Sequence, residues 1–565
     1  MEATKDEERP LIHRHRLPQL GGISQYTSDG TVDFHKKPAL KRNTGNWRAC
    51  FLILAAEFSE CVAFFAISKN LVTYLTDELH ESNVDAAKNV SAWIGCSFFT
   101  PLIGAFLADT YLGRYWTVVI FVSLHAISAL TPMLLGSYYS SGIHRAVAYL
   151  GLYLAALGNG GIKPCTSAFG ADQFDGGDPT ERVTKGSFFN WYYFSINVGS
   201  LLSATVLVWV QDNVGWGVGF AVPTAFMVSG IAVFVAGRKV YRYKTLGGSP
   251  ITRVSQVVVA AVRNYHLELP DDSSDLHDVP SPHCKIEHTH EFRFLDKAAV
   301  VAPSSGGEKG PAAPASSWRL CTVSQVEELK MLLRMFPVWA SMVLFFAVTA
   351  QMSSTFIEQG AAMDNRVGPF TLPPASMATF DVVSVMVCIP VYDAVLVPLA
   401  RRATGKDRGL SQLQRLGAGL ALSVAGMLYA ALVEARRLAL APAGRKMSIM
   451  WQAPAFAVLG AGEVFTAIGV LEFFYDQSPG GMKSLGTALA QLTVAAGNYL
   501  NSAVLGAVAA ATARGGRPGW IPDDLDQGHL DYFFWMMAAL GAVNLLHFLH
   551  CSVRYRGNNI SGKAS

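Results

Sequence analysis

The apolar residues of this 565-residue chain are gathered into separate runs of about 20 residues, with polar stretches between them. A helix of that length crosses the hydrocarbon layer of a bilayer. The chain is 51% hydrophobic and 15% charged, whereas soluble proteins carry about 25% charged residues. These features exclude a single water-soluble core and predict an all-α polytopic membrane protein.

A hydropathy window predicts 12 transmembrane helices, in two groups of six. Two halves of this kind are typical of a duplicated transporter, with its substrate site near the midplane between them. The expected spans are 49–75, 91–110, 115–137, 146–169, 188–210, 218–237, 331–354, 374–399, 412–433, 451–475, 484–512 and 530–553.

The linker between the halves contains "LPDDSSDLHDVPSPH" and "APSSGGEKGPAAPASS". Such Pro-, Ser-, Gly- and Asp-rich segments cannot bury a core, so we expect the linker to be partly disordered. The predicted parts are the N-terminal tail 1–48, the first bundle 49–237, the linker 238–330, the second bundle 331–553 and the C-terminal tail 554–565.

Lysine and arginine near the span ends predict the orientation, because cytoplasmic loops carry an excess of both. The N-terminal tail, the start of the linker and the C-terminus are all basic, so we expect both termini to be cytoplasmic. The exception is the loop after the ninth span, which carries Arg436, Arg437, Arg445 and Lys446 on the predicted outer side. This topology suits a plasma membrane or a vacuolar membrane, and we favour the plasma membrane.

Four ionisable residues stand out inside the predicted spans: Glu57 and Glu60 in the first, Lys163 in the fourth and Glu463 in the tenth. Such residues are costly in lipid and indicate a functional site. Glu57 and Glu60 share one helix face, and like charges there repel, so we expect at least one to carry a proton near neutral pH. The alternative is that both side chains reach toward the membrane surface, or that the first span lies shallower in the membrane than expected.

Lys163 and Glu463 lie one in each half, so the pair is expected to bridge the halves and to break or form during a transport cycle. A static structural ion pair is the alternative. Asp381 starts the eighth span and is a weaker candidate, because at that position it could be solvated.

Motifs of membrane enzymes and pumps are missing: the chain has no HExxH, GxSxG or GxxxxGK[ST] sequence. The eight cysteines and the linker histidines lack the spacing of a specific metal site, so no metal or organic cofactor is predicted. A net charge of +3 does not suggest a nucleic-acid partner. "RYWT" ends at Thr117 and is a weak kinase pattern, which makes Thr117 a candidate phosphorylation site.

Three motifs resemble those of the plant nitrate and peptide transporter family, a branch of the proton-dependent oligopeptide transporters. They are "GAFLADTYLGRYWT" (104–117), "GNGGIKPCTSAFGADQFD" (158–175) and "FFNWYYFSINVGSLL" (188–202). The stretches "GWIPDDLDQGHLDYFF" and "MSIMWQAPAFAVLGAGEVF" are most similar to the plant di- and tripeptide transporter subfamily. The resemblance covers about residues 25–555 and implies the major facilitator fold.

The resemblance also implies residue roles, with protons as the coupling ion. Glu57 and Glu60 match the two acids of an ExxE[R/K] motif implied in proton coupling. Lys163 matches a lysine implied in coupling and in holding the substrate carboxylate. Glu463 matches an acid implied in proton coupling and in receiving a peptide amino terminus.

Other matches and departures concern the binding pocket. Asn197 and Asp381 match polar pocket positions of the family, whereas Phe64 and Phe65 stand where peptide-transporting relatives usually have tyrosines. Cys61 replaces the Arg or Lys of the ExxE[R/K] motif. Further departures are Thr349, where one nitrate-transporting branch has histidine, Ala350, where some relatives have an acid, and Val470, where glutamine is common.

Cys61 lies one helical turn after Glu57, so an arginine there would face Glu57 and could bind a carboxylate. Without it, we expect the glutamate pair to keep its proton more readily, Lys163 alone to bind the substrate carboxylate, and the phenylalanines to favour a more apolar substrate.

The sequence thus favours a proton-coupled symporter of small solutes, most similar to di- and tripeptide transporters, for which a monomer suffices. Nitrate, a larger organic acid, a hormone or a specialised metabolite is the alternative cargo. A transport-inactive membrane sensor is the alternative of another class, and an enzyme is disfavoured.

Overall fold

The structure is a computed structural model of the chain. It describes residues 25–28, 30–135, 141–175, 178–244, 250–270, 276–277, 288–301, 316, 318–404, 410–479, 483–513 and 519–555. Most of the predicted C-terminal tail, the first 24 residues, and most of both low-complexity linker segments lie outside the described residues.

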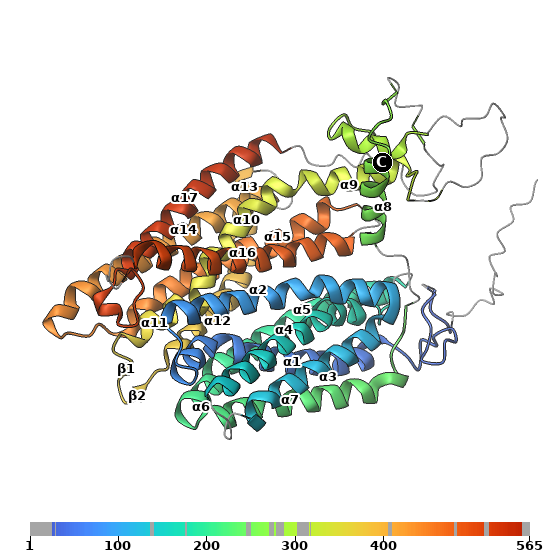
Figure 1. The fold of residues 1–565 in the computed structure, drawn as a ribbon. Coiled ribbons are helices and arrows are strands. Elements are labelled where there is room, and N and C mark those ends of the chain that lie inside the picture. Colours follow the sequence, from blue (N-terminus) through green and yellow to red (C-terminus); the bar gives the residue numbers. More distant parts are fainter. Residues whose placement is uncertain are drawn as a thin grey trace, which may run out of the picture.

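The N-terminal half is a helical bundle, drawn in blue to green in Figure 1. A five-residue π-helix, η2 (Ser203–Leu207), joins α5 to α6, so the two helices belong to one continuous span. The helices are α1 (Asn46–Asp77), α2 (Asn83–Leu107), α3 (Arg114–Leu135), α4 (Ser141–Ala171), α5 (Pro179–Leu202), α6 (Val208–Asn213) and α7 (Trp216–Ala236).

The C-terminal half forms the second layer, in yellow to red (Figure 1). Its helices are α9 (Val323–Arg334), α10 (Phe336–Thr349), α11 (Thr355–Ala361), α12 (Ala378–Val391), α13 (Val397–Thr404), α14 (Gln412–Leu440), α15 (Ala453–Gln477), α16 (Lys483–Thr512) and α17 (Leu530–Arg554). A short antiparallel pair, β1 (Arg366–Val367) and β2 (Phe370–Thr371), follows α11. Within the described residues, 10 helical segments are long and apolar enough to cross a membrane, and α3 and α4 occupy the other two predicted spans.

Glycines allow α2 and α4 to cross with their backbones in contact. A Cβ added to Gly104 would lie 2.2 Å from the carbonyl oxygen of Gly160, and one added to Gly160 would lie 2.5 Å from Cβ of Thr100. Small residues at such crossings provide the close packing that holds membrane helices together, since lipid offers no hydrophobic driving force. Gly160 therefore allows α4 to lie against α2, whereas Gly158 and Gly161 of the same "GNGG" sequence face α3.

Gly160→Ala is expected to destabilise the N-terminal half, because the added methyl group clashes with Thr100. Overpacking of this kind costs about 1–3 kcal/mol. The matched control is Gly217→Ala in α7, where an added Cβ meets nothing within 4 Å. Thermal unfolding of the detergent-solubilised protein should show a lower midpoint for Gly160→Ala and no loss for the control. Equal midpoints would contradict the close crossing.

The N-terminal segment and the start of the linker lie at the same end of the molecule. Val32 and Tyr243 exchange backbone hydrogen bonds of 2.9 and 2.8 Å, and Lys41 bonds to Asp175 and Asp178 after α4 at 3.1 and 2.9 Å. Burial alone would lower the pKa of Lys41, but these two carboxylates outweigh it and raise the pKa. The predicted placement of both segments on one side of the membrane fits this arrangement.

The two halves are joined at the opposite end, where α1 ends and α2 begins. Asn83 donates hydrogen bonds of 3.2 Å to the carbonyls of Pro522 and Asp523, between α16 and α17. Deeper along the same helices, Asn501 of α16 donates to Ser91 of α2 at 2.9 Å. The side-chain amides of Asn83 in α2 and Asn501 in α16 therefore connect the halves at this end.

The basic loop that broke the charge rule contains a buried, neutralised arginine. Arg437 near the end of α14 bonds to Glu434 at 2.8 Å and also to Asp526. Its charge is balanced by these two acids, so Arg437 adds no net positive charge to the loop.

The linker contains a folded unit, which we call the linker unit, between its undescribed segments. Helix α8 (Pro250–Arg263), the 3₁₀ turn η5 (Arg293–Ala299) and the start of α9 enclose a small apolar core. The core residues are Val257, Ala260, Ala261, Leu276, Leu295, Ala298, Ala299, Cys321, Val323, Val326 and Leu329. The linker therefore contains a folded part beside its low-complexity segments, which the expectation of partial disorder did not describe.

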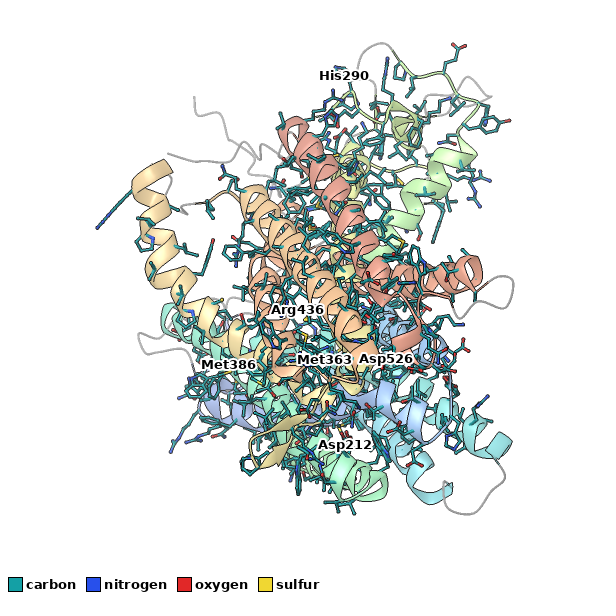
Figure 2. The ribbon with its side chains drawn as sticks, turned by 90° about the vertical axis from the view of Figure 1, so that its left-hand side faces the viewer. Asp212, His290, Met363, Met386, Arg436 and Asp526 are labelled. Atoms are coloured by element: carbon teal, nitrogen blue, oxygen red, sulfur yellow. The ribbon has the colours of Figure 1, made fainter. Side chains whose placement is uncertain are left out.

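A buried ion cluster also stabilises the linker unit. Lys330 lies 2.7 Å from Asp296 and 2.8 Å from Glu327, and all three side chains are buried. His288 lies 3.2 Å from Asp296. His288, Asp296 and Glu327 are potential metal ligands, and their ligand atoms lie within 4.8 Å of one another. The Lys330 ammonium, however, already occupies the position that a cation would take. Figure 2 shows the neighbouring His290 far from Asp212 of α6.

The thiol of Cys321 is expected to resist labelling while the linker unit is folded. Cys321 is buried, and burial raises the pKa of this thiol to about 11. That rise lowers the reactive thiolate fraction by about a hundredfold at neutral pH. Maleimide labelling of membranes, read by peptide mass spectrometry, should modify Cys321 far more slowly than an exposed Ser316→Cys control. Equal rates would show that the unit is unfolded.

Candidate functional site

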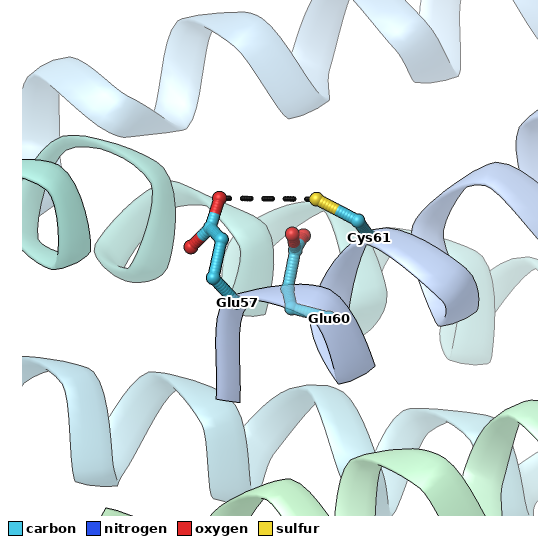
Figure 3. Close-up of side chains that lie close together, drawn as sticks. All are labelled: Glu57, Glu60 and Cys61. Atoms are coloured by element: carbon cyan, nitrogen blue, oxygen red, sulfur yellow. Dashed lines mark hydrogen bonds between the residues drawn. The ribbon is translucent and has the colours of Figure 1, made fainter. Parts of the chain in front are cut away.

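Two buried glutamates and a cysteine meet on α1, inside the N-terminal half (Figure 3). Glu57 accepts hydrogen bonds from Thr166 of α4 at 2.6 Å and Tyr192 of α5 at 2.7 Å. The Cys61 thiol donates to Glu57 at 3.8 Å. Both oxygens of Glu60 are buried without a hydrogen-bond partner.

The two carboxylates form a pair in which the members differ. Ligand atoms of Glu57, Glu60 and Cys61 lie within 4.8 Å of one another. Two ionised carboxylates this close in a dry site would repel strongly, and Glu60 lacks the donors that would stabilise its charge. Glu57 is thus held by hydroxyl groups, whereas Glu60 has no hydrogen-bond partner.

Lys163 of α4 is enclosed by aromatic rings. Its ammonium lies 3.8 Å from the ring centre of Phe64 and 4.4 Å from that of Phe98. Lys163 is half-buried, and cation–π contacts contribute about 0.5–2 kcal/mol between exposed and desolvated sites. The charge of Lys163 also acts on both glutamates, so Lys163 belongs to the Glu57–Glu60 site.

A cavity of about 370 Å³ lies between the halves. Its charged lining residues, among those described, are Lys69 of α1, Asp381 of α12 and Glu463 of α15. A second cavity of about 280 Å³ lies near Asp85 and Trp520, away from the intramembrane charges. The larger cavity is the candidate substrate site, because it has the size of a small-molecule pocket and charges of both signs.

The cavity brings together most of the predicted pocket residues. Its lining includes Phe64, Phe65, Asn197, Asp381 and Glu463. The departures at 349, 350 and 470 are also part of its wall. The residues in which this chain differs from its family are therefore mostly residues that a substrate would touch.

Cys61 and Lys163 are not among the lining residues. Cys61 instead packs close to α5. A Cβ added to Gly199 of α5 would lie 3.0 Å from Cβ of Cys61. The expectation that Cys61 lines the substrate pocket is not supported in this conformation. Its thiol contacts Glu57, so its influence falls on the carboxylate pair.

The expected bridge between Lys163 and Glu463 is not formed. Lys163 contacts the two rings, and Glu463 lines the cavity without it. Among the described residues, the ion pair that spans the halves is Lys69 with Asp381, at 3.8 Å. Asp381 is buried and paired, which corrects the expectation that it could be solvated.

The sequence interpretation overlooked three intramembrane ionisable residues. Lys69 falls within the first apolar run, and the rule that selected Glu57 would also have selected it. Glu358 in α11 is buried with both oxygens unpartnered, and both ring nitrogens of His125 in α3 are in the same state.

Thr117 does not lie on an accessible surface. Its side chain is 0% exposed, and its hydroxyl donates to the carbonyl of Gly113 at 3.0 Å. A kinase cannot reach this hydroxyl in the described conformation, so the structure argues against the predicted phosphorylation site.

Comparisons with known proteins agree with the fold. A family model described as "POT family" matches residues 115–521. The protein named NRT1/PTR FAMILY 8.3 from Arabidopsis thaliana is 49% identical over 99% of this chain and 100% of its own length. NRT1/PTR FAMILY 8.1 from the same plant is 47% identical over 95% of this chain and 99% of its own.

Solved structures show the same fold at low sequence identity. An auto-inhibited POT family peptide transporter matches with a TM-score of 0.69 and 23% identity, covering 91% of this chain and 98% of its own. A POT family transporter in complex with 5-aminolevulinic acid has a TM-score of 0.65 and 15% identity over 91% and 98% of the two chains. The prediction of twelve helices in the major facilitator fold is confirmed. The chain belongs to the POT family and is a proton-coupled membrane transporter.

Proposed function

We propose that this transporter imports di- and tripeptides together with protons, by alternating access of the two halves. The observation that carries the proposal is the charge pattern of the cavity between the halves. Lys69 lies on one side, and Asp381 and Glu463 lie on the other. A peptide is a zwitterion, so its carboxylate and its amino group each find an opposite charge in the same cavity.

Each group of residues has a proposed role. Glu57 and Glu60 carry the coupled proton, and Lys163 takes part in proton coupling through its positive charge beside them. Glu463 binds the peptide amino terminus and titrates with the cycle. Asn197, Phe64 and Phe65 contact the body of the substrate, with the two rings favouring apolar side chains.

The halves are joined by hydrogen bonds at one end of the molecule, and this arrangement fits an inward-facing state. The halves are joined where α1 ends, through Asn83 and the segment around Pro522. With both termini cytoplasmic, as the basic tails indicate, this is the outer end. A plasma-membrane location with this orientation makes the protein an importer driven by external acidity, and a single chain contains the whole site.

Two-electrode voltage clamp in oocytes tests the proposal. Dipeptides at millimolar concentration should evoke inward currents that grow as the bath is acidified and that compete with one another. Nitrate and organic acids, applied in the same panel, are the comparison. If dipeptides neither carry current nor inhibit labelled uptake, the peptide assignment is wrong; a current with nitrate alone would replace it. A transport-inactive sensor would give no proton-driven current with any of these solutes.

A further inference from the structure

Lys69 is the one cation among the described residues that line the cavity. It is 14% exposed, and its Nζ lies 3.8 Å from Oδ2 of Asp381, whose side chain is 11% exposed. Lys69 also lies 5.7 Å from the ring centre of Phe65. The ion pair connects α1 of the first half to α12 of the second.

This pair is a loose one. A separation of 3.8 Å is beyond hydrogen-bonding distance, so only charge attraction holds the two groups. The other oxygen of Asp381, Oδ1, is buried without a hydrogen-bond partner. Glu463 adds a second carboxylate to the same cavity, so the lining holds one negative charge more than Lys69 can balance when both acids are ionised. A ligand that makes direct hydrogen bonds to Lys69 would compete well against Asp381.

Asp381 lines the cavity, and the backbone of α15 makes room for Oδ1, the carboxylate oxygen that does not face Lys69. A Cβ added to Gly460 of α15 would lie 2.7 Å from Oδ1 of Asp381, so this glycine leaves room for the carboxylate. Glu463 follows Gly460 by three residues on the same helix and lines the same cavity. Two carboxylates thus gather on the C-terminal half, opposite the ammonium of Lys69.

Lys163 is less suited to bind a substrate carboxylate. Its ammonium lies against the rings of Phe64 and Phe98, and Phe64 itself forms part of the cavity wall. Binding a carboxylate there would require the rings to move aside. Lys69 needs only to release Asp381.

We propose that Lys69 is the carboxylate-binding cation of this transporter and that Asp381 is the resting partner which the substrate carboxylate displaces. The proposal rests on the proposed function, because it assigns one end of a peptide. On binding, the peptide carboxylate replaces Asp381 at Lys69, and the peptide ammonium takes the freed Asp381 and Glu463. The direct ion pair between the halves becomes a bridge through the substrate.

The test compares inhibition by a dipeptide with inhibition by its C-terminal amide, using uptake of a labelled dipeptide. Wild type should prefer the free acid. Lys69→Gln should raise the half-inhibitory concentration of the free acid by about tenfold to a hundredfold and leave that of the amide nearly unchanged, since a charge-assisted hydrogen bond contributes about 1.5–3 kcal/mol. Lys69→Arg should retain the preference. Lys88→Gln, at an exposed pair with Asp85, is the matched control.

Asp381→Asn keeps the test decisive if Lys69→Gln does not reach the membrane. Removing the competing carboxylate frees Lys69, so the preference for the free acid over the amide should increase. An unchanged ratio in either correctly inserted variant would overturn the proposal, as would loss of the ratio in Lys163→Gln alone. If wild type takes up no peptide, the proposed function fails first; if it does and the ratio is insensitive to residue 69, only this inference fails.

Discussion

Glu60→Gln is expected to lower proton-driven uptake by about a hundredfold, near the upper range of coupling between two ligands. Glutamine has nearly the same shape but cannot take up a proton. Glu60 is 0% exposed and both its oxygens lack partners, so no hydrogen bond stabilises an ionised Glu60 in this conformation. Uptake into proteoliposomes under an imposed pH gradient measures the effect.

Exchange without a gradient separates coupling from folding. Glu60→Gln should still exchange internal for external peptide, because the cavity lining does not include residue 60. Glu78→Gln, an exposed change at the end of the same helix, is the control and should behave as wild type. Gradient-driven uptake that stays at wild-type level in Glu60→Gln would remove Glu60 from the coupling mechanism.

Cys61→Arg is expected to move the pH optimum of uptake toward a more acid bath by about one pH unit. The new guanidinium would lie beside Glu57 and Glu60, whose oxygens are within 4.8 Å of the present thiol. A positive charge there favours the ionised carboxylates, so more external acid is needed to load the proton. The preference for a free carboxylate should not change, because position 61 does not line the cavity.

A size control is needed, because Cys61 is buried against Gly199. Cys61→Met adds bulk without charge, and it should lower protein yield or stability without moving the pH optimum. If methionine shifts the optimum as much as arginine does, packing rather than charge explains the effect. If neither variant shifts it, Cys61 does not tune the carboxylate pair.

The spans and the buried acids could be predicted from the sequence, because both follow from the cost of placing groups in lipid. Which of these residues meet could not. Lys163 and Glu463 carry opposite charges in opposite halves, yet Lys163 packs against Phe64 and Phe98. Membrane depth can be estimated from position in an apolar run, whereas the direction of a side chain depends on how the helices pack.

The other misses have the same origin. Cys61 belongs to a pocket motif but packs toward Gly199. The core of the linker unit includes Leu276, Leu295 and Cys321, which are spread among low-complexity segments. No local hydrophobic periodicity therefore predicts that they share a core. Long-range packing brings these residues together, and a hydropathy window along the sequence cannot detect such packing.

The linker unit provides a labelling site from which the transport cycle can be followed by fluorescence. It contains the start of α9, and α9 ends at Arg334, directly before α10 of the C-terminal half. The N-terminal segment around Val32 is hydrogen-bonded to Tyr243, just beyond α7 of the other half. The linker unit and this N-terminal segment lie at the same end of the molecule (Figure 1). A fluorophore on each would convert the rocking of the halves into a change in energy transfer, without placing a label in the cavity.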